Sequence, residues 1–264
     1  MVEQMVSFFV SGFVYPGLSG AKILVGVGLG IAFGAIWLAG YRPPLRSRPW
    51  LWAVLAISAF LTWTAVAFIQ IPLQFWVGQA LGHFWSPEVL MSRLLLFGIP
   101  QILLSGLVQE GAKLVPIVLY WRREGKSLDP KLGLVIGAVA GAGLGIFEAV
   151  WAHNHVFLSG WSWQLVQTQG LVALAPFGER FFVVAAHTAF SALAGYGLAK
   201  GKGWQFYLIA SCLHAFLNYS AVLLIGGCIT SVVQLEIYVI VYALAVTGWA
   251  LWLRWRKPAA TSEV

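Results

Sequence analysis

Long apolar runs, each separated from the next by a short polar segment, dominate the pattern of the sequence. Seven of these runs approach or exceed the roughly 20 mainly apolar residues that a helix needs to span a bilayer. The first 17 residues are also apolar but contain Gly12, Pro16 and Gly17, so they form either an interfacial segment or an extension of the first span. We place the seven spans near residues 18–40, 50–78, 93–121, 132–153, 179–199, 204–227 and 232–253.

The longest connection, about residues 154–178, is expected to be non-helical. It either caps an outward-facing cavity or is a plain interfacial connection. Composition agrees with lipid as the solvent, because only 9% of the residues are charged, whereas a soluble domain carries roughly 25%. We therefore predict an all-α, polytopic transmembrane helix bundle, a single domain over residues 1–264, in the plasma membrane of a prokaryote.

The basic residues predict how the bundle is oriented. Twelve of the 16 Lys and Arg residues fall in four segments that this arrangement places on one side, around residues 42–48, 122–131, 200–202 and 254–257. The opposite side carries only Lys22, Arg93 and Arg180. Because basic loops stay in the cytoplasm, we expect the N-terminus outside and the C-terminus in the cytoplasm. Because the basic residues lie in short loops between apolar runs, we do not take the net charge of +7 as the sign of a nucleic-acid partner, and we expect none.

Charged side chains deep in lipid are costly, so each one needs a partner or a function. Glu110 and Lys113 fall three residues apart in the third span, and Glu148 falls in the fourth. His187 and His214 are central in the fifth and sixth spans. At a rise of 1.5 Å per residue, the two Glu and two His residues lie about 18 to 25 Å from the basic side. Four helices thus bring metal-competent or proton-active groups to similar depths.

Spacing along the helices indicates that these groups face the interior of the bundle. His214 shares a helix face with Asn218, and His187 shares one with Ser191. Glu148 continues a stripe of glycines that recurs every fourth residue, at positions 133, 137, 141 and 145. Such a stripe lets a second helix approach closely, so we expect Glu148 to point into the bundle.

Two His nitrogens and one carboxylate can form a three-ligand zinc site that leaves a fourth position open for water. Bound zinc would make this water acidic enough to supply a nucleophile at neutral pH, and a second carboxylate could carry the proton. We predict Glu148, His187 and His214 as Zn²⁺ ligands and Glu110 as the general base. Exchange of the two Glu roles is nearly as well supported, and a metal-free mechanism in which Glu and His activate water is the alternative.

Three further residues have predicted roles. Asn218 either donates a hydrogen bond to the developing oxyanion or orients a metal ligand. Lys113 either holds Glu110 ionised or polarises the substrate carbonyl. Arg180 either binds substrate at the outer mouth or, as we favour, has a structural role.

Four segments resemble the motifs of a known family. They are Gln109-Glu110-Gly111-Ala112-Lys113, the glycine-rich run ending in Phe147-Glu148-Ala149, Glu179-Arg180 followed by His187-Thr188-Ala189-Phe190-Ser191, and His214-Ala215-Phe216-Leu217-Asn218. In this order they resemble the PrsW/YhfC-type intramembrane metallopeptidases, part of a wider group that includes the CAAX-processing and bacteriocin-processing membrane proteases. The motif-bearing core spans about residues 93–227. Gln109 stands where the family usually has a second Glu, and Ala149 stands where PrsW members often have Asn.

The resemblance implies a membrane-embedded hydrolase that cuts peptide bonds of membrane-anchored or small membrane proteins. In PrsW-type members the cleavage is of the regulatory site-1 type, on an anti-sigma factor cut from the outer side. The same polar cluster also suits two other classes of protein. One is a transporter in which the acids and histidines relay protons. The other is a non-catalytic membrane scaffold or immunity protein. A peptidase predicts that the four groups converge beside a water-accessible cavity, whereas a scaffold predicts paired side chains without one.

Overall fold

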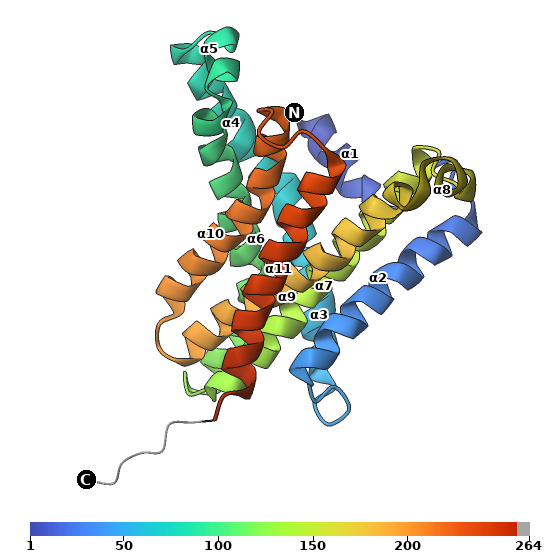
Figure 1. Ribbon diagram of the computed structural model, residues 1–264. Coiled ribbons are helices and arrows are strands. Elements are labelled where there is room, and N and C mark those ends of the chain that lie inside the picture. Colours follow the sequence, from blue (N-terminus) through green and yellow to red (C-terminus); the bar gives the residue numbers. More distant parts are fainter. Residues whose placement is uncertain (258–264) are drawn as a thin grey trace.

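The computed structural model in Figure 1 describes residues 1–257. The secondary structure of these residues is helical throughout, and seven helices are long and apolar enough to cross a membrane. Residues 258–264, the end of the expected domain, lie outside the described residues. The prediction of an all-α bundle with about seven spans is confirmed. The spans are α2 Gly20–Tyr41, α3 Trp50–Ala65 continued by η1 Val66–Gln70 and α4 Ile71–Phe84, α6 Leu94–Arg123, α7 Pro130–Leu158, α9 Ala175–Ala199, α10 Gly203–Ile225 and α11 Val232–Trp255.

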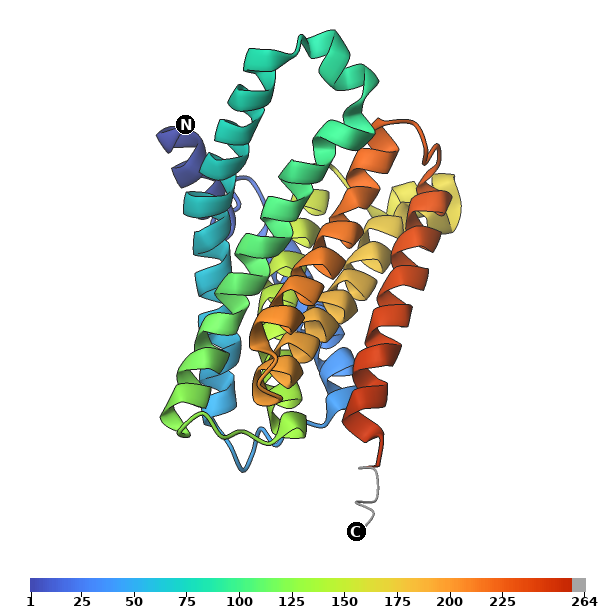
Figure 2. The ribbon, with the colours of Figure 1, turned by 90° about the vertical axis from the view of Figure 1, so that its left-hand side faces the viewer.

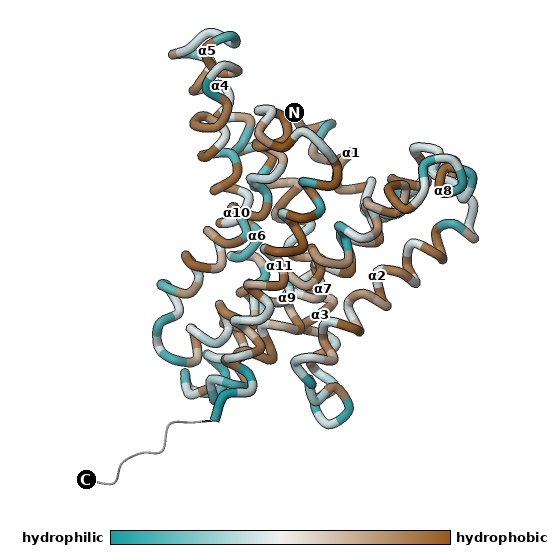
Figure 3. The backbone as a smooth tube through the Cα atoms, viewed as in Figure 1, coloured by the Kyte–Doolittle hydropathy of each residue, from teal (hydrophilic) through white to brown (hydrophobic). Residues whose placement is uncertain are grey.

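The two ends of the bundle differ in structure and charge. The connections at residues 42–49, 124–129 and 200–202 lie at one end, together with the end of α11, and we call it the basic end. The opposite end carries the short helices α1 Val2–Ser11, α5 Pro87–Ser92, α8 Trp163–Gln169 and η2 Gly170–Leu174. Figure 3 shows hydrophilic residues gathered mainly at these two ends and hydrophobic residues along the helices between them. This distribution is the one expected of a bundle that crosses lipid.

The long connection before α9 differs from its prediction. We expected residues 154–178 to be non-helical, but α7 continues to Leu158 and the connection contains α8 and η2. Its apolar residues form short helices, and two glycines with positive φ lie where the helices are interrupted. These are Gly160 and Gly170, with φ of +94° and +70°. Glycine tolerates such angles, so the chain turns at these positions, and α8 lies between them.

Helices α7 and α9 form the centre of the bundle. Every residue from Gly133 to Gly145 in α7 and from Val183 to Gly197 in α9 is buried. The glycine stripe of α7 faces α9, and a Cβ atom at Gly137 or Gly141 would collide with a backbone carbonyl oxygen of α9. Absence of side chains at these positions therefore lets the two backbones approach closely. The carbonyls concerned belong to Ser191 and His187.

The remaining helices surround this pair. Helix α2 packs on α7, α11 packs on α9, and α10 lies between α9 and α6. Helix α6 also contacts α3, and a Cβ atom at Gly106 of α6 would collide with the backbone of Ser211 in α10. Figure 2 shows α4, α5 and α6 forming an arch at the end opposite the basic end. Four helices, α6, α7, α9 and α10, therefore meet in the interior with their polar residues facing one another.

Candidate active site

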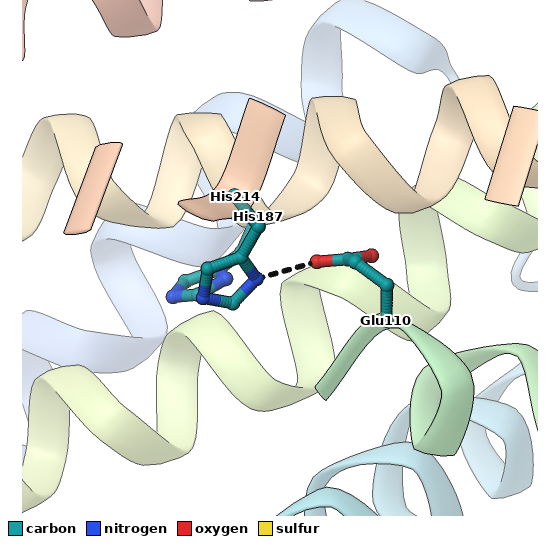
Figure 4. Close-up of side chains that lie close together, drawn as sticks. All are labelled: Glu110, His187 and His214. Carbon is teal, nitrogen blue, oxygen red and sulfur yellow. Dashed lines mark hydrogen bonds and ion pairs between the residues drawn. The ribbon is translucent and has the colours of Figure 1, made fainter. Parts of the chain in front are cut away.

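The structure brings together the acids and histidines that the sequence places on four helices. Glu110 lies on α6, Glu148 on α7, His187 on α9 and His214 on α10. Glu110, His187 and His214 each offer one possible ligand atom, and these three atoms lie within 4.8 Å of one another. Figure 4 shows the two imidazole rings beside the Glu110 carboxylate. The three side chains form the metal-competent cluster of the protein.

The Glu110 carboxylate is fully buried and has three partners. Lys113, one turn along the same helix, forms an ion pair with Oε1. His214 Nδ1 lies 2.7 Å from the same oxygen, and Ser191 Oγ donates to Oε2 at 3.1 Å. These partners come from α6, α9 and α10, so one carboxylate joins three helices. A buried carboxylate needs such partners, because otherwise nothing would compensate the free energy lost when water is removed from it.

His187 connects the two carboxylates of the site. Its Nε2 lies 2.8 Å from Glu148 Oε2, and its Nδ1 lies 3.3 Å from Lys113 Nζ. Because a carboxylate only accepts hydrogen bonds and an ammonium only donates them, the imidazole donates from Nε2 and accepts at Nδ1. The polar contacts therefore run from Glu110 through Lys113 and His187 to Glu148.

Arg180 extends these contacts toward the end opposite the basic end. Its Nη1 donates to Glu148 Oε1 at 3.1 Å, and its Nη2 donates to Glu179 Oε1 at 2.5 Å. Both arms of the guanidinium are thus held by carboxylates. This pairing supports the structural role that we favoured for Arg180, since the side chain orients Glu148 beside His187.

The side chain of Glu148 is more exposed than those of Glu110, Lys113, His187 and His214. Glu110 and Lys113 are 0% exposed, His187 2% and His214 1%. The Glu148 side chain is 26% exposed. Glu110 is therefore closed to solvent in this structure, and Glu148 is the more exposed of the two acids.

The donor set fits a metal ion. Tetrahedral zinc holds its nitrogen and oxygen ligands at about 2.0–2.2 Å, which separates the ligand atoms by about 3.3 Å. The three donors of Glu110, His187 and His214 would need only small side-chain movements to reach such a spacing. Moreover, Glu110 Oε1 and His187 Nδ1 already direct lone pairs at a cation, the Lys113 ammonium. A bound metal would be held by Glu110, His187 and His214 and would supply the positive charge that this ammonium supplies without it.

Asn218 lies one helical turn from His214 but has a different partner. Its Nδ2 donates to Ser105 Oγ at 2.8 Å, and Gln109 Nε2 also approaches this hydroxyl, at 3.3 Å. Gln109 further donates to Gln70 Oε1 of the second span at 3.1 Å. Ser105 and Gln70 were missed from the sequence because uncharged polar residues inside the spans were considered only where they shared a helix face with a histidine or stood in a family motif. Uncharged polar residues within apolar runs were the available signal.

Comparison with known proteins identifies the family of this chain. Residues 46–249 match the model of a family described as PrsW family intramembrane metalloprotease. This range covers most of the 264 residues and contains every site residue described above. No curated protein and no solved structure matches the chain.

Proposed function

Since this chain belongs to the PrsW family of intramembrane metalloproteases, we propose that it hydrolyses peptide bonds at the cluster of Glu110, His187 and His214. The chain is a peptidase, and its seven spans make it a multi-pass membrane protein. Its substrates are membrane-anchored or small membrane proteins, and its metal is zinc. The observation that carries the proposal is the convergence of three buried ligand atoms from three helices within 4.8 Å of one another.

In the proposed site, Glu110, His187 and His214 hold the metal. When bound, zinc supplies a Lewis acid and makes a water reactive at neutral pH. Glu148 is the general base, because its side chain, 26% exposed, is the more accessible of the two carboxylates. It lies against Nε2 of His187, on the opposite side of the ring from Nδ1, so this carboxylate must leave Nε2 to reach the attacking water. It accepts a proton from the attacking water and passes it to the nitrogen of the leaving amine. In this assignment, Glu110 and Glu148 have exchanged the roles first predicted for them from the sequence.

Lys113 and Asn218 assist in different ways. Lys113 keeps Glu110 ionised and compensates its buried charge before metal binds. Asn218 shares a helix face with His214, so its amide is the proposed donor to the oxyanion that forms on the substrate carbonyl. For this role the amide must leave Ser105, its partner at 2.8 Å.

The orientation and location complete the proposal. The basic end faces the cytoplasm, the N-terminus lies outside, and the membrane is the plasma membrane of a prokaryote. Glu148 and Arg180 then face the outer side of the metal cluster. Cleavage would be of the regulatory site-1 type, on a single-span protein such as an anti-sigma factor.

A non-catalytic scaffold is the second candidate, because the side chains of Glu110 and Lys113 are fully paired and closed to water. The two functions can be distinguished in cells that produce the unsubstituted protein, the Glu110→Gln variant or the Glu148→Gln variant. New N-termini of membrane proteins are identified by mass spectrometry of each membrane fraction. A peptidase generates N-termini within or near spanning segments that both variants fail to generate. Identical N-termini in all three samples would support the scaffold.

A further inference from the structure

The metal cluster is buried, so a peptide can reach it only where two helices separate. Glu110, His187 and His214 are each no more than 2% exposed. A seam used for entry must be held by contacts that the incoming peptide can replace. The inference below rests on the proposed function and concerns the route of the substrate to that site.

Helices α4 and α6 are joined by a reciprocal pair of glutamines. Gln74 Nε2 donates to the backbone oxygen of Gln101 at 2.8 Å, and Gln101 Nε2 donates to the backbone oxygen of Gln74 at 3.0 Å. Both side chains are partly buried. They lie on the two limbs of the arch in Figure 2. The seam is thus closed by side-chain amides bonded to backbone carbonyls of the facing helix.

The amide contacts continue from this pair toward the metal cluster. Gln70 Nε2 donates to Gln74 Oε1 at 3.4 Å, and Gln109 Nε2 donates to Gln70 Oε1 at 3.1 Å. Gln109 immediately precedes Glu110 in the chain. We call Gln70, Gln74, Gln101 and Gln109 the glutamine track. It leads from the partly exposed limbs of the arch to the residue beside a proposed metal ligand.

The backbone of both limbs is irregular beside the track. The π-helix η1 ends at Gln70, and Pro72 follows in the first turn of α4. In α6, Pro100 lies inside the helix directly before Gln101. A π-helical turn and a proline each interrupt the regular ladder of helix hydrogen bonds, and short π segments are frequent at functional sites. Both limbs can therefore bend where the track lies.

The chemistry of the track matches an unwound peptide. Within lipid, a segment that leaves helical form must find partners for its N–H and C=O groups. A carboxamide offers two donors and an acceptor, the same kinds of group as a peptide bond. The track already bonds the carbonyls of Gln74 and Gln101, so a substrate backbone can take the place of these carbonyls. Uncharged amides also avoid the cost of a charge in the membrane.

We propose that the seam between α4 and α6 is the entry for the substrate, and that the glutamine track binds the backbone of its unwound segment. Gln74 and Gln101 release each other and bond the peptide instead. Gln70 and Gln109 then hold the peptide where it reaches Glu110. Gln109, which differs from the usual acid of the family, serves here as a substrate-binding residue.

The test uses the double variant Gln74→Leu/Gln101→Leu and the control Gln79→Leu, whose residue is exposed on α4 outside the track. Each purified protein is incubated with detergent-solubilised membranes from cells that produce Glu110→Gln. The rate at which new N-termini appear is measured together with zinc content and thermal stability. We expect the double variant to cleave about tenfold or more slowly, with zinc content and stability retained, since only substrate binding is lost. The control should cleave at the parent rate.

A reversible cross-link tests entry separately. In a Cys212→Ser/Cys228→Ser background, Gly78→Cys/Gln101→Cys places thiols across the seam, because a Cβ at Gly78 would lie 3.6 Å from the Gln101 amide nitrogen. Because Gln101→Cys removes a residue of the track, the rate of this variant before cross-linking is the reference. A short bifunctional thiol reagent should stop the remaining cleavage, and a reductant should restore it to the reference rate. The same treatment of Phe216→Cys/Tyr238→Cys, across α10 and α11, should leave cleavage unchanged.

The outcomes separate the two proposals. Parent-like cleavage by the double leucine variant, or cleavage that cross-linking of the seam leaves unchanged, would overturn the glutamine track as the substrate route while leaving the peptidase intact. If the unsubstituted protein produces no N-termini that depend on Glu110, the proposed function fails, and the substrate route fails with it.

Discussion

Glu148 and His187 come from different helices, yet Glu148 Oε2 and His187 Nε2 lie 2.8 Å apart. The contact depends on the close approach of α7 and α9, which the glycines of α7 permit. It leaves His187 Nδ1 turned toward Lys113 and the Glu110 side of the cluster. One side of the imidazole therefore faces the partly exposed Glu148, and the other side faces the buried ion pair of Lys113 and Glu110. This asymmetry is the basis for assigning different roles to the two acids.

Replacement of the proposed base should abolish cleavage without emptying the metal site. Glu148→Gln retains the shape of the side chain but cannot accept a proton. A general base contributes about 10²- to 10⁴-fold, so we expect a loss of that size in cleavage rate. Zinc content should equal that of the unsubstituted protein. Loss of zinc from this variant would instead support the assignment of Glu148 as a ligand.

Removal of the buried ammonium should couple stability to metal. Lys113→Met leaves Glu110 without its ion-pair partner in a fully buried position. Breaking a buried pair costs about 3–5 kcal/mol, but a bound metal would supply the missing positive charge. We expect thermal unfolding of Lys113→Met at a markedly lower temperature when a chelator is present, and much less change for the parent. Equal effects of the chelator on both proteins would argue against metal at Glu110.

Side chains added to the glycine stripe should separate α7 from α9. Gly137→Leu and Gly141→Leu would force atoms against the carbonyls of Ser191 and His187. Overpacking of this kind costs about 1–3 kcal/mol or more, and the displaced His187 would lose Glu148. We expect a lower unfolding temperature and little cleavage. Gly28→Leu is the matched control, because a Cβ there meets nothing within 4 Å.

The orientation can be tested with a native cysteine. Cys228 is exposed and follows α10 at the end opposite the basic end. In a Cys212→Ser background, a maleimide that cannot cross membranes should label Cys228 in intact cells. With Cys228→Ser added, Ser47→Cys in the basic-end connection should be labelled only after the cells are opened. The reverse pattern would place the basic end outside.

Much of the fold follows from length and hydropathy alone. Each span is bounded by polar residues, so its existence and approximate limits can be read from the sequence. Depth along a helix is similarly predictable from a constant rise, which is why Glu110, His187 and His214 could be expected to meet. Helical connections such as α8 were not predicted, because short amphipathic segments lack a span-length signal.

The pairing within the site was less predictable. Depth does not determine how far each helix is rotated or how closely two helices approach. The sequence therefore predicted Glu148 as a ligand and Glu110 as the base, with the exchanged roles nearly as well supported. The structure places Glu110 in the group of three residues that could hold a metal ion, and Glu148 against the other side of His187. Likewise, the contact from Gln109 to Gln70 joins positions 39 residues apart and depends on tertiary packing.

Metal content tests the central claim most directly. Detergent-purified protein is compared with His187→Ala, His214→Ala, Glu110→Gln and Glu148→Gln, with folding of each confirmed by its elution and thermal unfolding. We predict about one equivalent of zinc in the parent and in Glu148→Gln, and loss of zinc from the other three. A folded parent without bound metal would contradict the zinc mechanism, and zinc retained in Glu110→Gln but lost from Glu148→Gln would reverse the assignment of the two acids.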